Sequence, residues 1–253
     1  MNGIKFKGDG KERNGAGFFR DLDLSGRLCY GQRQLQIHDR KADHMAEILK
    51  VDGANLAQTL ESAVRLITSG RVVAFPTDTV YGLGADPFNL AAVSEVYRVK
   101  GRAFNRPLPL LVSSLDQAME LTSDPPRLFF ELATKYWPGP LTLVVPGSRL
   151  VPLRVTGNTG NIGLRWPRSN VALALITASA RPLTGTSANL ANHAECKTAA
   201  EVDEQIGKNL PLILDGGSTG DNASSTVVAL TGLRPQILRH GPISETELKE
   251  FFG

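Results

Sequence analysis

The stretch Val72–Gly84 carries the most informative set of chemically active side chains in this 253-residue sequence, because an apolar run ends there in a turn of hydroxyls and glycines. Thr77 and Thr79 could orient a polar ligand, since a strand that runs into such a turn commonly presents backbone N–H groups to ligands. A strand-ending turn in which Asp78 bonds its own backbone explains the same residues equally well. By itself the stretch predicts either a small-molecule site or a turn.

Positive charge follows about one helix further along the chain. Lys100, Arg102 and Arg106 lie within seven residues and are interrupted by glycine, which suits a loop around phosphates. A solvated helix end beside the negative end of the helix dipole is the alternative explanation. Ser187 and Asn189 follow a later apolar stretch, where they could approach a phosphate or a base, or simply cap a helix. Together the two segments favour an anionic ligand.

Two arginines end otherwise apolar stretches, Arg165 in GLRWP and Arg239 in ILRHG. An arginine anchored in this way can bind a carboxylate or phosphate through two hydrogen bonds, although many such side chains only reach solvent. Outside residues 1–44 the only histidines are His193 and His240, and neither lies near a serine or cysteine in a nucleophile-elbow sequence. We therefore expect chemistry by positioning and charge stabilisation rather than acid–base or covalent catalysis.

Composition limits the class of protein. The apolar fraction is 42%, no apolar run approaches the ~20 residues of a membrane helix, and the N-terminus lacks a leader pattern, so we expect a cytoplasmic globular protein without membrane contact. Cys29 and Cys196 have no metal-binding spacing and are expected to be free thiols. Residues 1–44 hold 9 of the 28 basic and 6 of the 25 acidic residues, which leaves 19 of each sign in residues 45–253. Bulk charge thus gives no case for nucleic-acid binding.

The pattern of apolar residues predicts one α/β domain. Residues 1–44 show no sustained period, and we expect a disordered extension or an upstream start placed before the true one at Met45, with a single domain over residues 45–253. Several predicted strands follow one another without a helix, so an open, twisted mixed sheet with flanking helices fits better than a doubly wound one.

The predicted elements are helices near 56–69, 90–99 and 171–179 and strands near 72–75, 108–112, 141–145, 162–166, 183–186, 212–214, 226–230 and 236–239. Ser113–Asp116 predicts a helix-starting capping box. Asp124 followed by Pro125 predicts an N-cap with proline at the first helical position.

Seven motifs in this order resemble the Sua5/YrdC/YwlC family of threonylcarbamoyl-AMP synthases, from about Asn55 to Ile243. They are PTDTVYGLG (76–84), KGR (100–102), WPGPLT (137–142), GLRWP (163–167), SAN (187–189), STV (225–227) and LRHG (238–241). The resemblance implies a YrdC-like domain with a concave active-site surface. It also implies a nucleotidyltransferase that condenses L-threonine, bicarbonate and ATP into threonylcarbamoyl-AMP and releases pyrophosphate, for threonylcarbamoyladenosine at position 37 of tRNA.

The resemblance also assigns roles to residues. Thr77, Arg165 and Ser225 would bind L-threonine, with Arg165 on its carboxylate, and Lys100 and Arg102 would be catalytic. The implied ATP contacts are Lys100, Arg102, Arg106, Asn161, Ser187, Asn189 and Arg239. Mg²⁺ is expected to arrive with ATP, because attack of a carbamate on the α-phosphorus needs charge neutralisation more than a protein nucleophile. The resemblance names no residue as a metal ligand.

Some positions depart from the family pattern. Asn161 stands where the family commonly has serine or threonine, and residues 191–198 lack its Leu-Ser-Gly and Pro-Thr-Thr runs, so nucleotide contacts from that segment stay open. Thr198 with Glu201 predicts a structural capping box instead. The expected partners are the downstream tRNA threonylcarbamoyl transferase proteins. Two other functions stay open: a double-stranded RNA-binding module with weak RNA binding, and a relative that forms a carbamoyl-adenylate for another acceptor.

Overall fold

The computed structural model describes residues 21–22, 28–29, 46–220 and 223–252. Contacts divide the chain into two units, Met1–Lys41 and Ala42–Gly253. In the first unit β1 (Asp21–Leu22) pairs antiparallel with β2 (Leu28–Cys29). The expectation of a disordered extension over residues 1–44 otherwise falls outside the described residues and stays a prediction.

The second unit contains a five-stranded mixed sheet in the order β10-β5-β4-β11-β3. Strand β11 runs parallel to both of its neighbours, β3 and β4, whereas β5 runs antiparallel to β4 and β10. The strands are β3 (Glu47–Lys50), β4 (Val73–Phe75), β5 (Gly82–Gly84), β10 (Thr186–Ser187) and β11 (Leu212–Asp215). The Thr77 turn thus joins the two antiparallel strands β4 and β5.

A second, six-stranded mixed sheet has the order β13-β12-β7-β8-β6-β9. Parallel pairs join β12 to β7 and β6 to β8, and the other neighbours are antiparallel. The strands are β6 (Leu110–Leu111), β7 (Leu141–Pro146), β8 (Asn161–Arg165), β9 (Leu183–Thr184), β12 (Thr226–Ala229) and β13 (Gln236–Arg239). The predicted mixed α/β class is confirmed, with the strands shared between two sheets.

Gly185 explains why the strand expected over 183–186 is divided between the sheets. It separates β9 from β10, and a Cβ at this position would come within 2.6 Å of Leu111 Cγ. Its backbone N–H donates to the Pro109 carbonyl at 2.8 Å, outside either ladder. The chain can cross from one sheet to the other here because glycine alone leaves room for Leu111.

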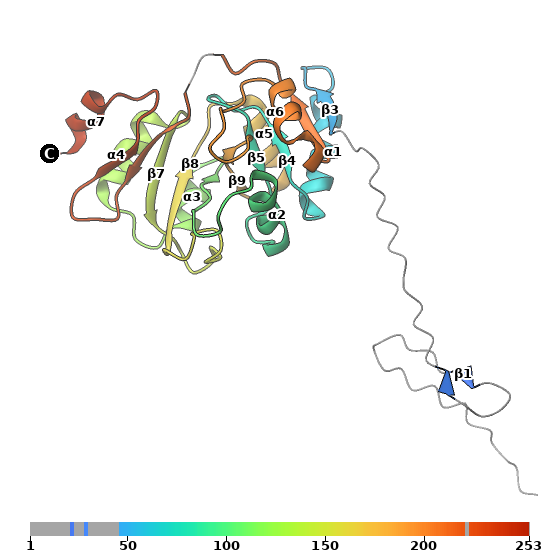
Figure 1. The fold of residues 1–253 in the computed structure, drawn as a ribbon. Coiled ribbons are helices and arrows are strands. Elements are labelled where there is room, and N and C mark those ends of the chain that lie inside the picture. The colour runs from blue at the N-terminus through green and yellow to red at the C-terminus, as the bar shows by residue number, and fades with distance from the viewer. Residues whose placement is uncertain (1–20, 23–27, 30–45, 221–222, 253) are drawn as a thin grey trace, which may run out of the picture. The chain divides into compact units, whose positions relative to one another are not determined.

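The described ranges contain seven α-helices that lie beside the two sheets (Figure 1). They are α1 (Leu56–Thr68), α2 (Leu90–Lys100), α3 (Leu115–Leu121), α4 (Arg127–Tyr136), α5 (Asn170–Ser179), α6 (Ala199–Ile206) and α7 (Glu245–Phe252), with a 3-10 turn at Gly207–Asn209. Helices α1 and α5 bury Leu60, Ile67 and Leu175 against Val73 and Leu212 of the five-stranded sheet. On the other sheet α4 packs against β7 and α7. No helix in the described ranges is long and apolar enough to cross a membrane.

Two of the three predicted helix starts differ from the structure. Ser114, not Ser113, is the N-cap of α3, where its side chain accepts from the Gln117 N–H. Helix α4 begins after Pro126 without a side-chain cap, because a residue that precedes proline is disfavoured in helical conformation and Pro125 precedes Pro126.

The capping box predicted at Thr198 and Glu201 is confirmed. Cys196 is a buried free thiol, as expected. The prediction for the Cys29 thiol lies outside the described side chains.

Candidate functional site

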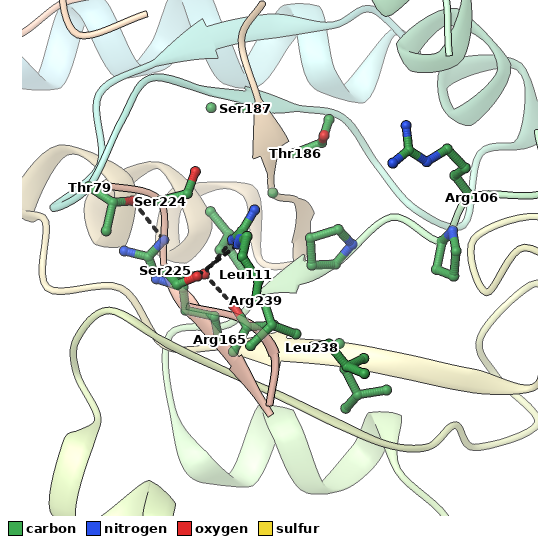
Figure 2. Close-up of a pocket in the computed structure, with 18 of the residues that line it drawn as sticks. Thr79, Arg106, Leu111, Arg165, Thr186, Ser187, Ser224, Ser225, Leu238 and Arg239 are labelled. Atoms are coloured by element: carbon green, nitrogen blue, oxygen red, sulfur yellow. Dashed lines mark hydrogen bonds between the residues drawn. The ribbon is translucent and has the colours of Figure 1, made fainter. Parts of the chain in front are cut away.

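A cavity of about 600 Å³ is lined by residues of both sheets and of the loop that follows α2. Its floor is formed by β7, β8, β12 and β13, and its other wall by the Thr77 turn, the start of β5 and the β9–β10 junction. Hydroxyl and guanidinium groups project into it from these elements (Figure 2). The fold therefore brings together motifs that lie far apart in the sequence.

The Thr77 turn is held by its own hydroxyl groups. Thr77 Oγ1 donates to the Val80 carbonyl at 2.7 Å and accepts from the Thr79 N–H at 3.2 Å. The Oγ1 atoms of Thr77 and Thr79 lie 3.0 Å apart, and both residues line the cavity. The turn thus presents two oriented hydroxyls at the point where β4 ends.

Arg165 ends β8 and inserts its guanidinium beneath this turn. Nε donates to the Gly139 carbonyl at 3.0 Å, Nη1 to Thr79 Oγ1 at 2.9 Å and Nη2 to Asp78 Oδ1 at 2.6 Å. The side chains of Arg165 and Asp78 are only 7% and 13% exposed. Burial lowers the pKa of Arg165, and the Asp78 carboxylate opposes that shift. A guanidinium has five N–H donors, so two remain for a ligand.

Ser225 and Arg239 continue the polar wall across the sheet. Ser225 Oγ lies 2.7 Å from Thr142 Oγ1, and Arg239 donates to Ser225 through Nε to the carbonyl and through Nη2 to Oγ, each at 2.9 Å. Figure 2 shows Arg165, Ser225 and Arg239 gathered on one side of the cavity, with Arg106 apart from them. Arg239 is therefore held by Ser225, the residue directly before β12.

Arg102 and Arg106 approach from the loop after α2. Arg102 donates through Nη2 to the Pro107 carbonyl at 2.8 Å and through Nη1 to Thr186 Oγ1 at 3.2 Å. Its buried Nε has no hydrogen-bond partner among the residues that the structure describes. Burial, then the charges of Arg106 and Arg239, lower the pKa of Arg102. Three guanidinium groups that repel one another favour a polyanionic ligand between them.

Lys100 and Asn189 lie behind the cavity wall rather than in it. Lys100 is 3% exposed, and its ammonium donates to the carbonyls of Ser187 and Asn189 at 2.5 and 2.9 Å and to Asn189 Oδ1 at 3.0 Å. Burial, then the charge of Arg102, lowers the pKa of Lys100 to about 8. Asn189 Nδ2 donates to the carbonyls of Leu190 and His193. Lys100 thus holds Ser187, which does line the cavity, and Asn189 holds Lys100.

The other predicted site residues all line the cavity: Thr77, Arg102, Arg106, Asn161, Arg165, Ser187, Ser225 and Arg239. The roles assigned to them stay predictions. The sequence reasoning missed the hydroxyls of Thr142, Thr186 and Ser224, which line the same cavity. Each lies within or directly beside one of the seven motifs. Their position next to a motif could therefore have identified them, whereas their spacing along the chain could not.

The segment 191–198 reaches the cavity wall indirectly. The Glu195 carboxylate accepts a short hydrogen bond from Ser224 Oγ. Glu195 also raises the pKa of Arg239, although burial outweighs it. No group of three or more histidine, cysteine or carboxylate side chains that could hold a metal ion occurs in the described part of the chain.

Comparison with known proteins decides the family. The family model for Sua5, YciO and YrdC proteins, described as "Telomere recombination", matches residues 65–241. The chain belongs to the Sua5/YciO/YrdC family. A family relative from Pyrococcus abyssi, the protein "Threonylcarbamoyl-AMP synthase", is 38% identical over 191 residues, which cover 76% of this chain and 56% of the relative.

Two further members of the Sua5/YciO/YrdC family support this. The "Threonylcarbamoyl-AMP synthase" of Bacillus subtilis is 36% identical over 196 residues, which cover 77% of this chain and 56% of that protein. The crystal structure of P. abyssi Sua5 complexed with L-threonine has a TM-score of 0.79 at 36% identity, over 82% of this chain and 61% of that one. The chain thus spans little more than half the length of these relatives.

Proposed function

We propose that this chain is a threonylcarbamoyl-AMP synthase, a nucleotidyltransferase that condenses L-threonine, bicarbonate and ATP and releases pyrophosphate. The observation that carries the proposal is one cavity with two differently charged ends. One end offers hydroxyls beside Arg165, which Asp78 neutralises, and the other offers Arg102 and Arg106, which form no ion pair with a described residue. That arrangement suits an amino acid next to a triphosphate, and relatives named for this activity support it.

Arg165 is the proposed carboxylate site for L-threonine. Two of its five N–H donors remain after its bonds to Gly139, Thr79 and Asp78, which suffices for a carboxylate. The hydroxyls of Thr77 and Ser225 lie within the same wall and would orient the amine and hydroxyl of the amino acid. Because Asp78 already balances one charge, the site would favour a zwitterion over a simple anion.

Arg102, Arg106 and Arg239 are the proposed phosphate contacts. Charge-assisted hydrogen bonds of this kind contribute about 1.5–3 kcal/mol each, and they strengthen as negative charge develops on the transferring group. Ser187 would add a hydroxyl, with Lys100 and Asn189 acting through it from behind the wall. Asn161 would contact the nucleoside part from the far end of β8.

In the proposed reaction the threonine amine adds to CO₂ and loses a proton, or adds to bicarbonate with loss of water, and forms a carbamate. A carbamate oxygen then attacks the α-phosphorus. The bond from the α-phosphorus to the bridging oxygen breaks, and pyrophosphate leaves with the electron pair. The chain's residues would hold the two reactants in line and offset charge, which can supply most of the rate enhancement without a protein nucleophile. The enclosed cavity would also keep water from the unstable carbamate.

Mg²⁺ fits this site as part of the MgATP substrate. The cavity is lined by arginines, and the described residues contain no group of side chains that could hold a metal ion. Such a cavity suits an ion that is held by the phosphates of the substrate. When bound, Mg²⁺ would neutralise phosphate charge.

The product defines the proposed cellular role. Threonylcarbamoyl-AMP is an activated acyl donor that needs an acceptor, and we propose that downstream tRNA threonylcarbamoyl transferase proteins pass it to tRNA in the cytoplasm. This would complete threonylcarbamoyladenosine.

The test measures pyrophosphate release by the purified chain with ATP, L-threonine, bicarbonate and Mg²⁺. We expect release that needs both threonine and bicarbonate and that L-alanine does not support. Arg102→Ala should abolish most of it, whereas Arg127→Ala, at an exposed position of α4, should not. Absence of threonine-dependent release overturns the proposal, and adenylate formation from carbamoyl phosphate without threonine preference would reassign the acceptor.

A further inference from the structure

The strand registers arrange the cavity floor in rows of side chains. Gly163 of β8 pairs with Val144 of β7, Val144 with Ala229 of β12, and Ala229 with Gln236 of β13. All four residues line the cavity. We call Gly163, Val144 and Ala229 the apolar row. It lies next to the row that contains Arg239, because Val227, two residues before Ala229, pairs with Arg239.

The apolar row carries no side chain larger than that of valine. A Cβ at Gly163 would lie 3.2 Å from Thr142 Cγ2 and 3.4 Å from Pro109 Cβ, so the position has little room for a larger side chain. Val144 and Ala229 add only short aliphatic groups. An apolar strip of small side chains beside a cluster of guanidinium groups suits a planar ring attached to phosphates, and neither threonine nor bicarbonate contains one.

A β-bulge places Gln236 on the same face as Arg239. The register shifts between Val227 and Val228, which pair with Arg239 and Ile237 and leave Leu238 as the extra residue. In a regular strand, residues three apart point to opposite faces. The extra residue restores the phase, so both side chains face the cavity. Their partners Val227 and Ala229 are two residues apart, which separates the two side chains by roughly 7 Å.

Two carboxamides face the cavity at the opposite ends of β8 and β13 from Arg165 and Arg239. Gln236 ends the apolar row on β13, and Asn161 begins β8 two residues before Gly163. Within the described ranges neither side-chain amide has a hydrogen-bond partner, whereas the Asn189 amide uses both its oxygen and its nitrogen. Each carboxamide can donate and accept at once.

We propose that the apolar row carries the nucleobase of ATP and that Gln236 is a specificity-determining residue which binds the edge of the adenine. The inference rests on the proposed function, because it takes the phosphates to lie at Arg239. The ribose then spans the roughly 7 Å along β13 between Arg239 and Gln236, and the adenine ring lies on the apolar row. The Gln236 amide then accepts from the exocyclic amine of adenine and donates to a ring nitrogen, as carboxamides do with adenine elsewhere.

The test compares ATP with purine riboside triphosphate, which lacks the exocyclic amine, and with inorganic tripolyphosphate, which lacks the nucleoside. Dissociation constants are measured by calorimetry for the wild type, Gln236→Leu and Gln236→Glu. Gln58→Leu, on the exposed face of α1, is the matched control. We expect the wild type and the control to bind ATP about tenfold more tightly than purine riboside triphosphate.

Gln236→Leu should bind ATP about tenfold more weakly and lose the preference for the amine, while its affinity for tripolyphosphate stays unchanged. Gln236→Glu should keep part of the preference, because a carboxylate still accepts from the amine but cannot donate. The proposal is overturned if Gln236→Leu keeps the full preference, or if tripolyphosphate binding weakens as much as ATP binding. The steady-state KM for threonine should not change, and a shift in it would assign the apolar row to the amino acid.

Threonine-dependent pyrophosphate release by the wild type is followed in parallel. If it is absent while the preference for the amine depends on Gln236, the proposed reaction fails and the nucleobase site stands. If pyrophosphate release is present and the preference for the exocyclic amine does not depend on Gln236, only the proposed nucleobase site is overturned.

Discussion

Arg165 beneath the Thr77 turn and Arg102 in the loop after α2 line the same cavity, but their charges and hydrogen-bond donors are satisfied in opposite ways. Every nitrogen of Arg165 has a protein partner, and Asp78 neutralises its charge. Arg102 has a buried Nε without a partner among the described residues, and burial, then the charges of Arg106 and Arg239, lower its pKa. The protein therefore pre-organises the first region by itself, whereas the second needs an anionic ligand to balance it.

Removal of Arg165 should have the largest effect and should act on folding. Arg165→Met removes the buried guanidinium that pairs with the largely buried Asp78 carboxylate, so we expect the free energy of unfolding to fall by about 3–5 kcal/mol. Urea denaturation followed by circular dichroism measures it. Arg106→Ala should change the free energy by less than about 0.5 kcal/mol, because its side chain is exposed. An equal loss of unfolding free energy in the two variants would contradict the idea that only Arg165 is part of the folded framework.

Removal of Arg102 should act on ligand binding instead. Loss of one charge-assisted contact should weaken ATP binding by roughly ten- to a hundredfold in Arg102→Ala, and leave threonine binding unchanged. Calorimetric titration with each substrate separates the two effects. Arg127→Ala serves as the control, because that arginine is 94% exposed on α4. A matching loss of threonine affinity would show that the two ends of the cavity are one site.

The pH dependence of ATP binding tests the arginine-rich end of the cavity separately, because Lys100 holds Ser187 from behind the cavity wall. Its lowered pKa of about 8 means that the folded protein loses this proton as pH rises through that value. A neutral amine has two N–H donors for three acceptors, so Ser187 is held less firmly and ATP affinity should fall severalfold between pH 7 and pH 9. Titrations across this range should show the step in the wild type and not in Lys100→Met.

Stability should respond to the same group in the opposite direction. Between about pH 8 and the ordinary value of 10.5, the unfolded chain binds more protons at Lys100 than the folded one. The free energy of unfolding of the wild type relative to Lys100→Met should therefore rise with pH in that window. Paired urea unfolding curves at pH 7.5 and pH 9.5 measure this difference, and a difference that fell with pH would contradict the burial of the ammonium.

The smallest effect is expected at Thr186. Thr186→Val keeps the shape of the side chain and removes the acceptor for Arg102 Nη1, a bond of 3.2 Å. ATP affinity should fall about two- to tenfold, since one neutral hydrogen-bond partner contributes about 0.5–1.5 kcal/mol. Thr142→Val is the matched variant, because it removes a hydroxyl that bonds Ser225 Oγ within the protein. Thermal unfolding compares the stability of both variants with that of the wild type. A loss of ATP affinity as large as that of Arg102→Ala would mean that Thr186 binds the ligand directly.

Much of this arrangement was predictable because it is local. The apolar run before Thr77, the periodic helix from Leu56 and the capping box at Thr198 depend on neighbours in the chain, and each was predicted correctly. The wrong N-cap predicted for α4 also has a local cause, because the second of two successive prolines delays the start of the helix beyond Pro125. Ordered motifs also predicted the family, because their order survives without knowledge of their contacts.

By itself the sequence determined the mixed α/β class, the family and the four arginines that line the cavity. Only the tertiary structure decided what the polar residues of the site contact: Lys100 and Asn189 face each other behind the wall, Asp78 neutralises Arg165, and a single bulged residue turns Gln236 toward the cavity. Such outcomes depend on register and on packing between segments about a hundred residues apart. Spacing along the chain carries no information about them, because a shift of one residue reverses the face of a strand.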